Sequence, residues 1–127
     1  MELIVDTNAL SAWMDGDPAL RPVLQNAQRI ALSPIALGEF RFGVLGSRHR
    51  AAYEEQLRLV EDEFPPLQIN GSTAQYYASL RRVLAARGRP IPWHDLWIAA
   101  QALQHRLQIL SRDTHFDLIP NLERVSW

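Results

Sequence analysis

The feature that most constrains the fold is an alternation of short, continuously apolar runs with longer helical segments. Apolar runs of three or four residues are typical of strands buried on both faces, and strands separated by helices favour a parallel sheet. We therefore expect a three-layer α/β/α sandwich with a central, mainly parallel sheet, formed as one domain over residues 1–127. The predicted strands cover residues 3–5, 29–32, 67–69, 107–110 and 122–125.

Capping residues and prolines indicate where the helices begin. Asp17-Pro18 and Ser33-Pro34 each place a capping side chain before a proline, which predicts that helices start there. Ser72 is the predicted cap of a later helix, and Gly88 is expected to end that helix in a left-handed conformation. Residues 93–104 are apolar on nearly every side, which predicts a central, buried helix. On two further helices, the positions expected to face inward are Tyr53, Leu57, Val60 and Phe64, and Tyr76, Leu80, Val83 and Leu84.

Residue types that are absent exclude several chemistries. The chain has no cysteine, which excludes thiol catalysis, disulfides and cysteine-ligated zinc. All 13 basic residues are arginines, so mechanisms that need a lysine, such as Schiff-base chemistry, are excluded too. With a net charge of −1, binding to nucleic acid requires local arginine patches. No apolar run approaches the ~20 residues of a membrane span, and the first six residues do not resemble a signal peptide. We therefore expect a cytoplasmic protein without a membrane partner.

Four acidic residues occupy positions that a parallel sheet would bring together. Asp6 directly follows the first predicted strand, and Asp113 comes three residues after Leu110, at the end of another. Glu39 and Asp95 lie in the first two turns of predicted helices. Ligands bind where the carboxyl ends of parallel strands meet, so we expect these four carboxylates at one edge of the sheet. Each acid alone suits a structural role such as a helix cap, but four together predict a functional site.

The carboxylates and their surroundings predict a hard divalent cation. Glu39 and Asp95 have small or apolar neighbours on their own helix faces, so each charge needs a cationic partner. Carboxylates and retained waters suit Mg²⁺ or Mn²⁺, and no two histidines are spaced three or four residues apart, which argues against zinc. The chemistry that best fits such a site is hydrolysis of a phosphodiester by a metal-activated water.

The four acidic segments resemble the motifs of PIN-domain ribonucleases, and in particular of VapC-type toxins from bacterial toxin–antitoxin pairs. The resemblance covers the whole chain in order and spacing, and its most specific segment is the one that begins at Asp95. The segments are Val5-Asp6-Thr7-Asn8, Glu39-Phe40-Arg41-Phe42-Gly43, Asp95-Leu96-Trp97-Ile98-Ala99-Ala100 and Ser111-Arg112-Asp113, with Gly88-Arg89-Pro90-Ile91-Pro92 and residues 116–122 as further matches.

This resemblance implies an Mg²⁺- or Mn²⁺-dependent RNA endonuclease that is dimeric and held inactive by a VapB-like antitoxin. It also implies that Asp6, Glu39, Asp95 and Asp113 are the catalytic, metal-binding acids and that Asn8 is a polar residue beside the first of them. His115 stands where many family members have a second late acid. The outer part of the site therefore departs from the family pattern, and the resemblance does not establish whether a second metal binds there. Asp113 is expected to be the fourth ligand, because Asp117 lies further along the loop, after Phe116, the expected anchor of that loop. Asp117 would reach the metal only if the loop curls inward, and together with Asn8 and His115 it is a candidate for the outer part of the site.

Contacts with RNA would come from arginine and aromatic side chains, although such residues more often form a solvated face or part of the core. The candidates are Arg41, Arg81, Arg82, Arg89, Trp93 and Arg112. An amphipathic antitoxin helix would fit a groove between the helices that carry Ala19-Leu20, Val23-Leu24 and Tyr53-Leu57-Val60.

Three alternative interpretations stay open from the sequence. A PIN-domain nuclease in RNA processing or decay would have the same site without a toxin role. A phosphoacceptor or haloacid-dehalogenase-like domain also has an acid after its first strand, but those sites rely on a lysine. A catalytically silent interaction module is disfavoured because all four acids are present.

Overall fold

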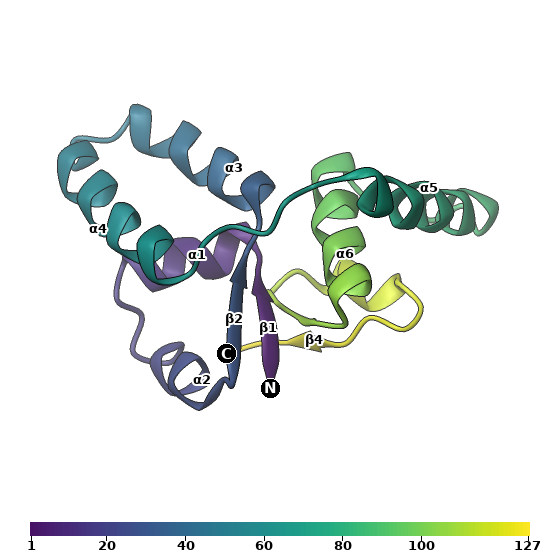
Figure 1. Cartoon of the computed structure of the whole chain (residues 1–127), viewed down its shortest axis with the longest axis horizontal. Coiled ribbons are helices and arrows are strands. Elements are labelled where there is room, and N and C mark those ends of the chain that lie inside the picture. The colour runs from purple at the N-terminus through teal and green to yellow at the C-terminus, as the bar shows by residue number, and fades with distance from the viewer.

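The computed structural model describes all 127 residues and contains a four-stranded sheet between two groups of helices (Figure 1). Every strand pairs in parallel, in the order β2-β1-β3-β4, which confirms the predicted three-layer α/β/α class. No helix is both long and apolar enough to cross a membrane. The elements are β1 (Glu2–Val5), α1 (Thr7–Met14), α2 (Arg21–Asn26), β2 (Arg29–Leu32), α3 (Pro34–Leu45), α4 (Arg50–Glu63), α5 (Gly71–Ala86), α6 (Trp93–His105), β3 (Gln108–Leu110), the 3-10 helix η1 (Thr114–Leu118) and β4 (Arg124–Val125).

Alternating side chains of β1 supply the two hydrophobic cores. Leu3 and Val5 pack on the face covered by α1, α3 and α4, whereas Ile4 packs on the face covered by α5 and α6. Successive side chains of a strand point to opposite faces, so a short apolar run serves both layers. Helix α6 is buried through Leu96, Ile98, Ala99, Ala100 and Ala102, as its composition predicts.

Two predicted helix starts are wrong by a few residues. Helix α2 begins at Arg21 rather than after Asp17-Pro18, because the Asp17 carboxylate accepts the backbone N–H of Ala19 and closes a turn there. Helix α5 is capped by Asn70 rather than Ser72. The Asn70 side chain accepts the backbone N–H of Thr73, and the Thr73 hydroxyl accepts that of Asn70, which gives a complete capping box.

The predicted strand at residues 67–69 does not form. Only the Leu67 N–H reaches β2, where it donates to the Leu32 carbonyl, and the preceding Pro65 and Pro66 have no N–H to extend a ladder. The Leu67 carbonyl accepts instead from Gln101 of α6, which is fully buried and also accepts from Ser33. This segment is therefore an extended connection held by side chains.

The inward face of α5 differs in part from the prediction. Leu80 and Leu84 are buried as expected, but Tyr76 and Val83 are exposed, and Thr73 and Tyr77 lie on the inner side instead. Gly88, just beyond α5, has a φ of 63°, which confirms the predicted left-handed cap. Helix α5 and the α3–α4 pair extend on opposite sides of the sheet (Figure 1).

Candidate functional site

Asp6 lies at the carboxyl end of β1 and begins α1 as its N-cap. Its backbone N–H donates to the Leu110 carbonyl at 3.1 Å, so the residue is fixed between β1 and β3 in the middle of the sheet. The side chain is only 2% exposed. Its Oδ2 accepts the Ser111 hydroxyl at 2.7 Å, whereas its buried Oδ1 has no hydrogen-bond partner.

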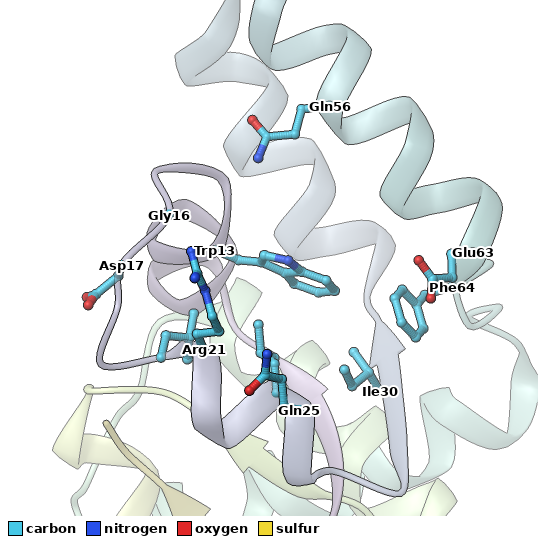
Figure 2. Close-up of a pocket in the computed structure, with 11 residues that line it drawn as sticks. Trp13, Gly16, Asp17, Arg21, Gln25, Ile30, Gln56, Glu63 and Phe64 are labelled. Carbon is cyan, nitrogen blue, oxygen red and sulfur yellow. The ribbon is translucent and has the colours of Figure 1, made fainter.

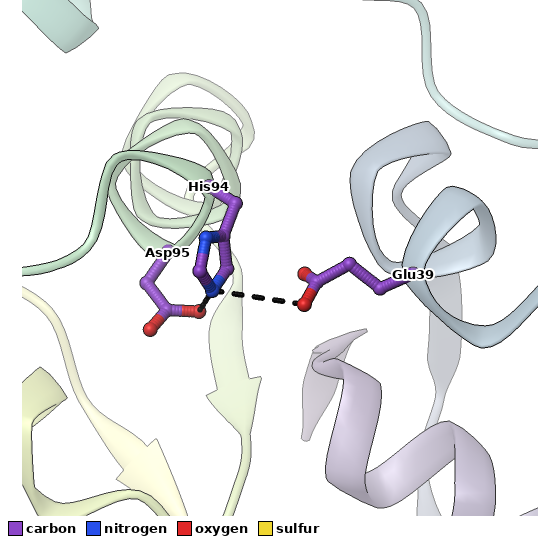
Figure 3. Close-up of side chains that lie close together, drawn as sticks. All are labelled: Glu39, His94 and Asp95. Carbon is purple, nitrogen blue, oxygen red and sulfur yellow. Dashed lines mark ion pairs between the residues drawn. The ribbon is translucent and has the colours of Figure 1, made fainter. Parts of the chain in front are cut away.

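Glu39 and Asp95 face each other from α3 and α6 across this edge of the sheet, with His94 between them (Figure 3). The Nε2 atom of His94 lies 3.6 Å from Glu39 Oε2 and 3.6 Å from Asp95 Oδ1. The hydroxyl of Thr7 orients Glu39 by donating to its Oε1 at 3.1 Å. The second turn of α3 and the first turn of α6 thus converge on the end of β1.

Asp113 and His115 form a second group of side chains near Asp95. Asp113 is the N-cap of η1, and His115 lies within η1. His115 Nε2 lies 2.9 Å from Asp95 Oδ2 without a hydrogen bond between them, and His115 Nδ1 lies 3.6 Å from Asp113 Oδ1. Phe116, the expected anchor, is fully buried and holds this loop against the core. Asp95 is therefore shared by two donor groups, Glu39-His94-Asp95 and Asp95-Asp113-His115.

A hydrogen-bonded network links Asp6 to the end of β3. The Ser111 hydroxyl donates to Asp6 and accepts from the Asp113 backbone N–H at 3.0 Å and from Asn8 Nδ2 at 3.2 Å. Asn8 also accepts the Arg112 backbone N–H and lies within 3.4 Å of Asp6 Oδ2. Ser111 and Thr7 are site residues that the sequence motifs do not assign a role. Their positions are the available signal, since Ser111 directly follows the strand beside Asp6 and Thr7 directly follows Asp6.

The electrostatics of the cluster are those of uncompensated negative charge. Burial raises the pKa of Asp6 above its ordinary value, and the charges of Asp113 and Glu39 add to this effect. Burial, followed by the charge of Asp6, raises the pKa of Asp95 to about 6. No arginine forms an ion pair with any of the four acids, and His94 and His115 are the basic side chains within ion-pair distance of them. Arg124 is near enough for the charge of Asp113 to raise its pKa.

These observations fit a divalent cation. A buried carboxylate oxygen without a partner, on Asp6, needs a compensating charge. Asp6 belongs to neither of the two donor groups that share Asp95, but its charge raises the pKa of Asp95, and the charges of Asp113 and Glu39 raise its own. The donor set differs from the all-carboxylate site expected from the sequence, because two imidazoles also face the acids. Carboxylates suit magnesium and manganese, whereas imidazole nitrogens suit zinc, copper, iron and nickel.

Asp117 does not join the cluster. Arg124 donates to both of its carboxylate oxygens at 2.9 Å, and these hydrogen bonds hold the pKa of Asp117 below its ordinary value. The same guanidinium donates to the Ser111 carbonyl at 3.2 Å. Asp117 therefore has its own cationic partner, unlike the four clustered acids.

The residues considered for RNA contact are divided among three regions. Arg41 pairs with Glu61 of α4, and Arg112 lies over the ring of Trp127 and donates to its backbone carbonyl. Arg81, on α5, lies over the exposed ring of Trp93, while Arg82 and Arg89 are exposed and form no ion pair.

A separate hollow of about 440 Å³ lies between α1, α2 and α4 (Figure 2). Leu24, Trp13, Phe64 and Ile30 are among its lining residues. It overlaps the groove expected from the sequence, but two of the expected side chains are internal: Leu57 is fully buried and Leu20 nearly so.

Comparisons with known proteins agree on one family. The family model of the PIN domain matches residues 3–122. Ribonuclease VapC5 of Mycobacterium tuberculosis is 31% identical over 118 residues, which cover 89% of this chain and 84% of that protein. Ribonuclease VapC4 of the same organism is 32% identical over 97 residues, 75% of each chain.

Solved structures give the same result. VapBC2 from Rickettsia felis, bound to a DNA fragment from its promoter, superposes with a TM-score of 0.85 at 26% identity and covers 100% of this chain and 99% of that one. VapBC-5 from Mycobacterium tuberculosis, a member of the VapBC family of toxin–antitoxin systems, has a TM-score of 0.77 at 29% identity with full coverage of both chains.

Proposed function

Since the chain belongs to the PIN-domain family, we propose that it is a divalent-metal-dependent RNA endonuclease and the toxin of a VapBC-type toxin–antitoxin pair. The observation that carries this proposal is the buried, unpartnered oxygen of Asp6 beside three further acids, Glu39, Asp95 and Asp113, whose charges act on Asp6 or respond to it. Residues 1–127 form a single nuclease domain in this proposal, with Mg²⁺ or Mn²⁺ as the resident ion.

We assign the metal to Asp6, Glu39, Asp95 and Asp113. A divalent cation bound there would activate a water for attack on the phosphodiester and offset the charge of the scissile phosphate. Ser111 and Asn8 fix the orientation of Asp6, and Thr7 fixes that of Glu39. These hydrogen bonds restrict the carboxylates before substrate binds, which lowers the cost of organising the site.

His94 and His115 lie at the outer side of the acids, in contact with Glu39, Asp95 and Asp113. An imidazole at such a position can carry a proton to or from a reacting oxygen. We assign proton transfer to the leaving group to one of these two side chains. This role needs no cysteine or lysine, in agreement with the composition.

The partner of this toxin would be a VapB-like antitoxin. Solved structures with this fold include VapBC2 from Rickettsia felis and VapBC-5 from Mycobacterium tuberculosis, a member of a family of toxin–antitoxin systems. The hollow between α1, α2 and α4 offers an apolar surface for an amphipathic helix. We also expect a homodimer, as the resemblance to VapC toxins implies.

Incubation with single-stranded RNA tests the enzymatic part of the proposal. Cleavage should require Mg²⁺ or Mn²⁺, stop in excess EDTA and resume when the metal is restored. Cleavage that persists in excess EDTA would refute it. Expression in cells then separates the toxin from an RNA-processing nuclease: a toxin arrests growth, and co-expression of a small antitoxin encoded beside it restores growth.

A further inference from the structure

The surface next to the acid cluster carries a local excess of positive charge. Residues 71–94, which form α5 and the start of α6, include four arginines and no acid, although the whole chain has a net charge of −1. None of these four arginines forms an ion pair, whereas Arg41, Arg50 and Arg58 on the opposite helices are all paired with acids. The four are Arg81, Arg82, Arg87 and Arg89.

Trp93 lies at the end of this basic segment, two residues before Asp95. It is the first residue of α6, and its side chain is 64% exposed. The guanidinium of Arg81 lies 4.5 Å from the centre of the indole ring, so a cation covers one side of an otherwise exposed aromatic group. An exposed aromatic ring beside a cation offers a face on which an unpaired base can stack.

A stack of planar groups holds Trp93 and Arg81 in place. Tyr77 of α5 is stacked on Trp97 of α6, with ring centroids 4.0 Å apart and an interplanar angle of 10°. The Tyr77 hydroxyl accepts from Arg81 at 3.1 Å, and Arg81 in turn lies over Trp93. The position of the exposed ring is thus linked to the packed interface between α5 and α6.

A hollow of about 450 Å³ lies along the same part of α5, with Tyr77, Arg81 and Arg82 in its lining. The two arginines supply positive charge at this concave surface. Positive grooves that follow the phosphates, combined with aromatic platforms for the bases, are the means by which proteins bind single-stranded nucleic acid.

We propose that Arg81, Arg82, Arg87, Arg89 and Trp93 form an arginine–tryptophan strip that binds single-stranded RNA, with an unpaired base stacked on Trp93. This inference rests on the proposed nuclease function and adds the surface that holds the RNA. A base in a duplex has both ring faces occupied by its neighbours and cannot stack on an indole, so the strip selects RNA that is unpaired next to the scissile phosphate.

RNA binding in EDTA tests the strip without cleavage. The affinity of a fluorescein-labelled, mixed-sequence RNA strand is measured by anisotropy for the wild type, Trp93→Leu and Trp93→Phe. Loss of one stacked base should weaken binding by roughly 5-fold to 150-fold in Trp93→Leu, and Trp93→Phe should retain most of the affinity. When the same strand is annealed into a duplex, its affinity should be the same for the wild type and for both variants.

Two arginine variants provide a matched comparison of charge. Arg82→Gln should weaken binding of the single strand and reduce its dependence on salt, because a phosphate contact is lost. Arg50→Gln removes an exposed arginine on α4 and should leave both properties unchanged. Circular dichroism confirms that each variant is folded.

The outcomes separate this inference from the nuclease proposal. If the wild type cleaves RNA and Trp93→Leu binds the single strand as tightly as the wild type, the strip is refuted and the nuclease stands. If Trp93→Leu changes only the sedimentation coefficient, the surface is a protein contact and the strip is again refuted. If Trp93→Leu loses binding but the wild type cleaves no RNA, the strip stands and the nuclease proposal fails.

Discussion

Ser111 connects three parts of the acid cluster through one hydroxyl group. This hydroxyl donates to Asp6 and accepts from Asn8 and from the backbone N–H of Asp113. Ser111 is fully buried. Hydrogen bonds of this kind orient a carboxylate that binds metal and are important for affinity. Ser111 is thus a positioning residue for two of the four acids.

Replacement of Ser111 with alanine should weaken metal binding without preventing folding. Asp6 Oδ2 loses its shortest hydrogen bond, and we expect Mn²⁺ affinity to fall by about 10-fold to 100-fold, as measured by calorimetric titration. Ser79→Ala, at an exposed serine on α5, is the control and should bind Mn²⁺ like the wild type. Equal affinities for Ser111→Ala and the control would contradict this role.

The two late acids should differ in their effect on the metal. Asp113 faces Asp95 and His115, whereas Asp117 is bound to Arg124. Asp113→Ala should therefore reduce Mn²⁺ affinity more than Asp117→Ala does in the same titration. A larger loss for Asp117→Ala would show that the fourth ligand is misassigned.

At the scale of elements, η1 positions Asp113 and His115 through a single buried ring. Phe116 is 0% exposed, and its removal should destabilise the chain by about 3–5 kcal/mol. Denaturant unfolding of Phe116→Ala would measure this loss. Leu118→Ala, at an exposed position on the same element, should cost far less, and similar losses in the two variants would contradict the anchoring role.

The elements that the sequence predicts well are those with strong local patterns. The helix after Ser33-Pro34 begins where its cap and proline predict, and the apolar runs give four of the five expected strands. The failures depend on tertiary contacts or on competing local hydrogen bonds. The carbonyl of Leu67 pairs with a glutamine from a distant helix, and Asp17 closes a turn instead of capping a helix.

The convergence of the acids was predictable because parallel topology brings the carboxyl ends of strands together. The contributions of His94 and Ser111 were not, because they depend on side-chain directions set by tertiary packing. The sequence places His115 near Asp113 at the outer part of the site, but it does not predict the contact of His115 with Asp95. The pairing of Asp117 with Arg124 is likewise a contact between η1 and β4 that no local pattern indicates.

At the scale of the whole molecule, the cluster makes the metal-free chain less stable as pH rises. The pKa of Asp95 is about 6 in the folded state, above its ordinary value of 3.8, so the folded chain retains a proton that the unfolded chain loses. The free energy of unfolding should therefore fall between pH 3.8 and about 6, with Asp6 acting in the same direction.

Urea unfolding in EDTA at pH 5 and pH 7 would measure this effect. Asp95→Asn cannot ionise, so its unfolding midpoint should fall less than that of the wild type between these two pH values. Mn²⁺ should then stabilise the wild type more than the variant, since a ligand stabilises the state that binds it. An identical pH dependence in both proteins would contradict the burial of a charged Asp95.

RNA cleavage by Asp6→Asn tests most directly the claim that the carboxylate cluster is the catalytic centre. The amide preserves the shape of the side chain but removes the charge that we assign to the cation. With Mn²⁺ present, we predict that the rate of cleavage falls by at least about 100-fold. The circular dichroism spectrum should match that of the wild type, and the unfolding midpoint in EDTA should be equal to or above the wild-type value. Cleavage by folded Asp6→Asn at the wild-type rate would contradict the account.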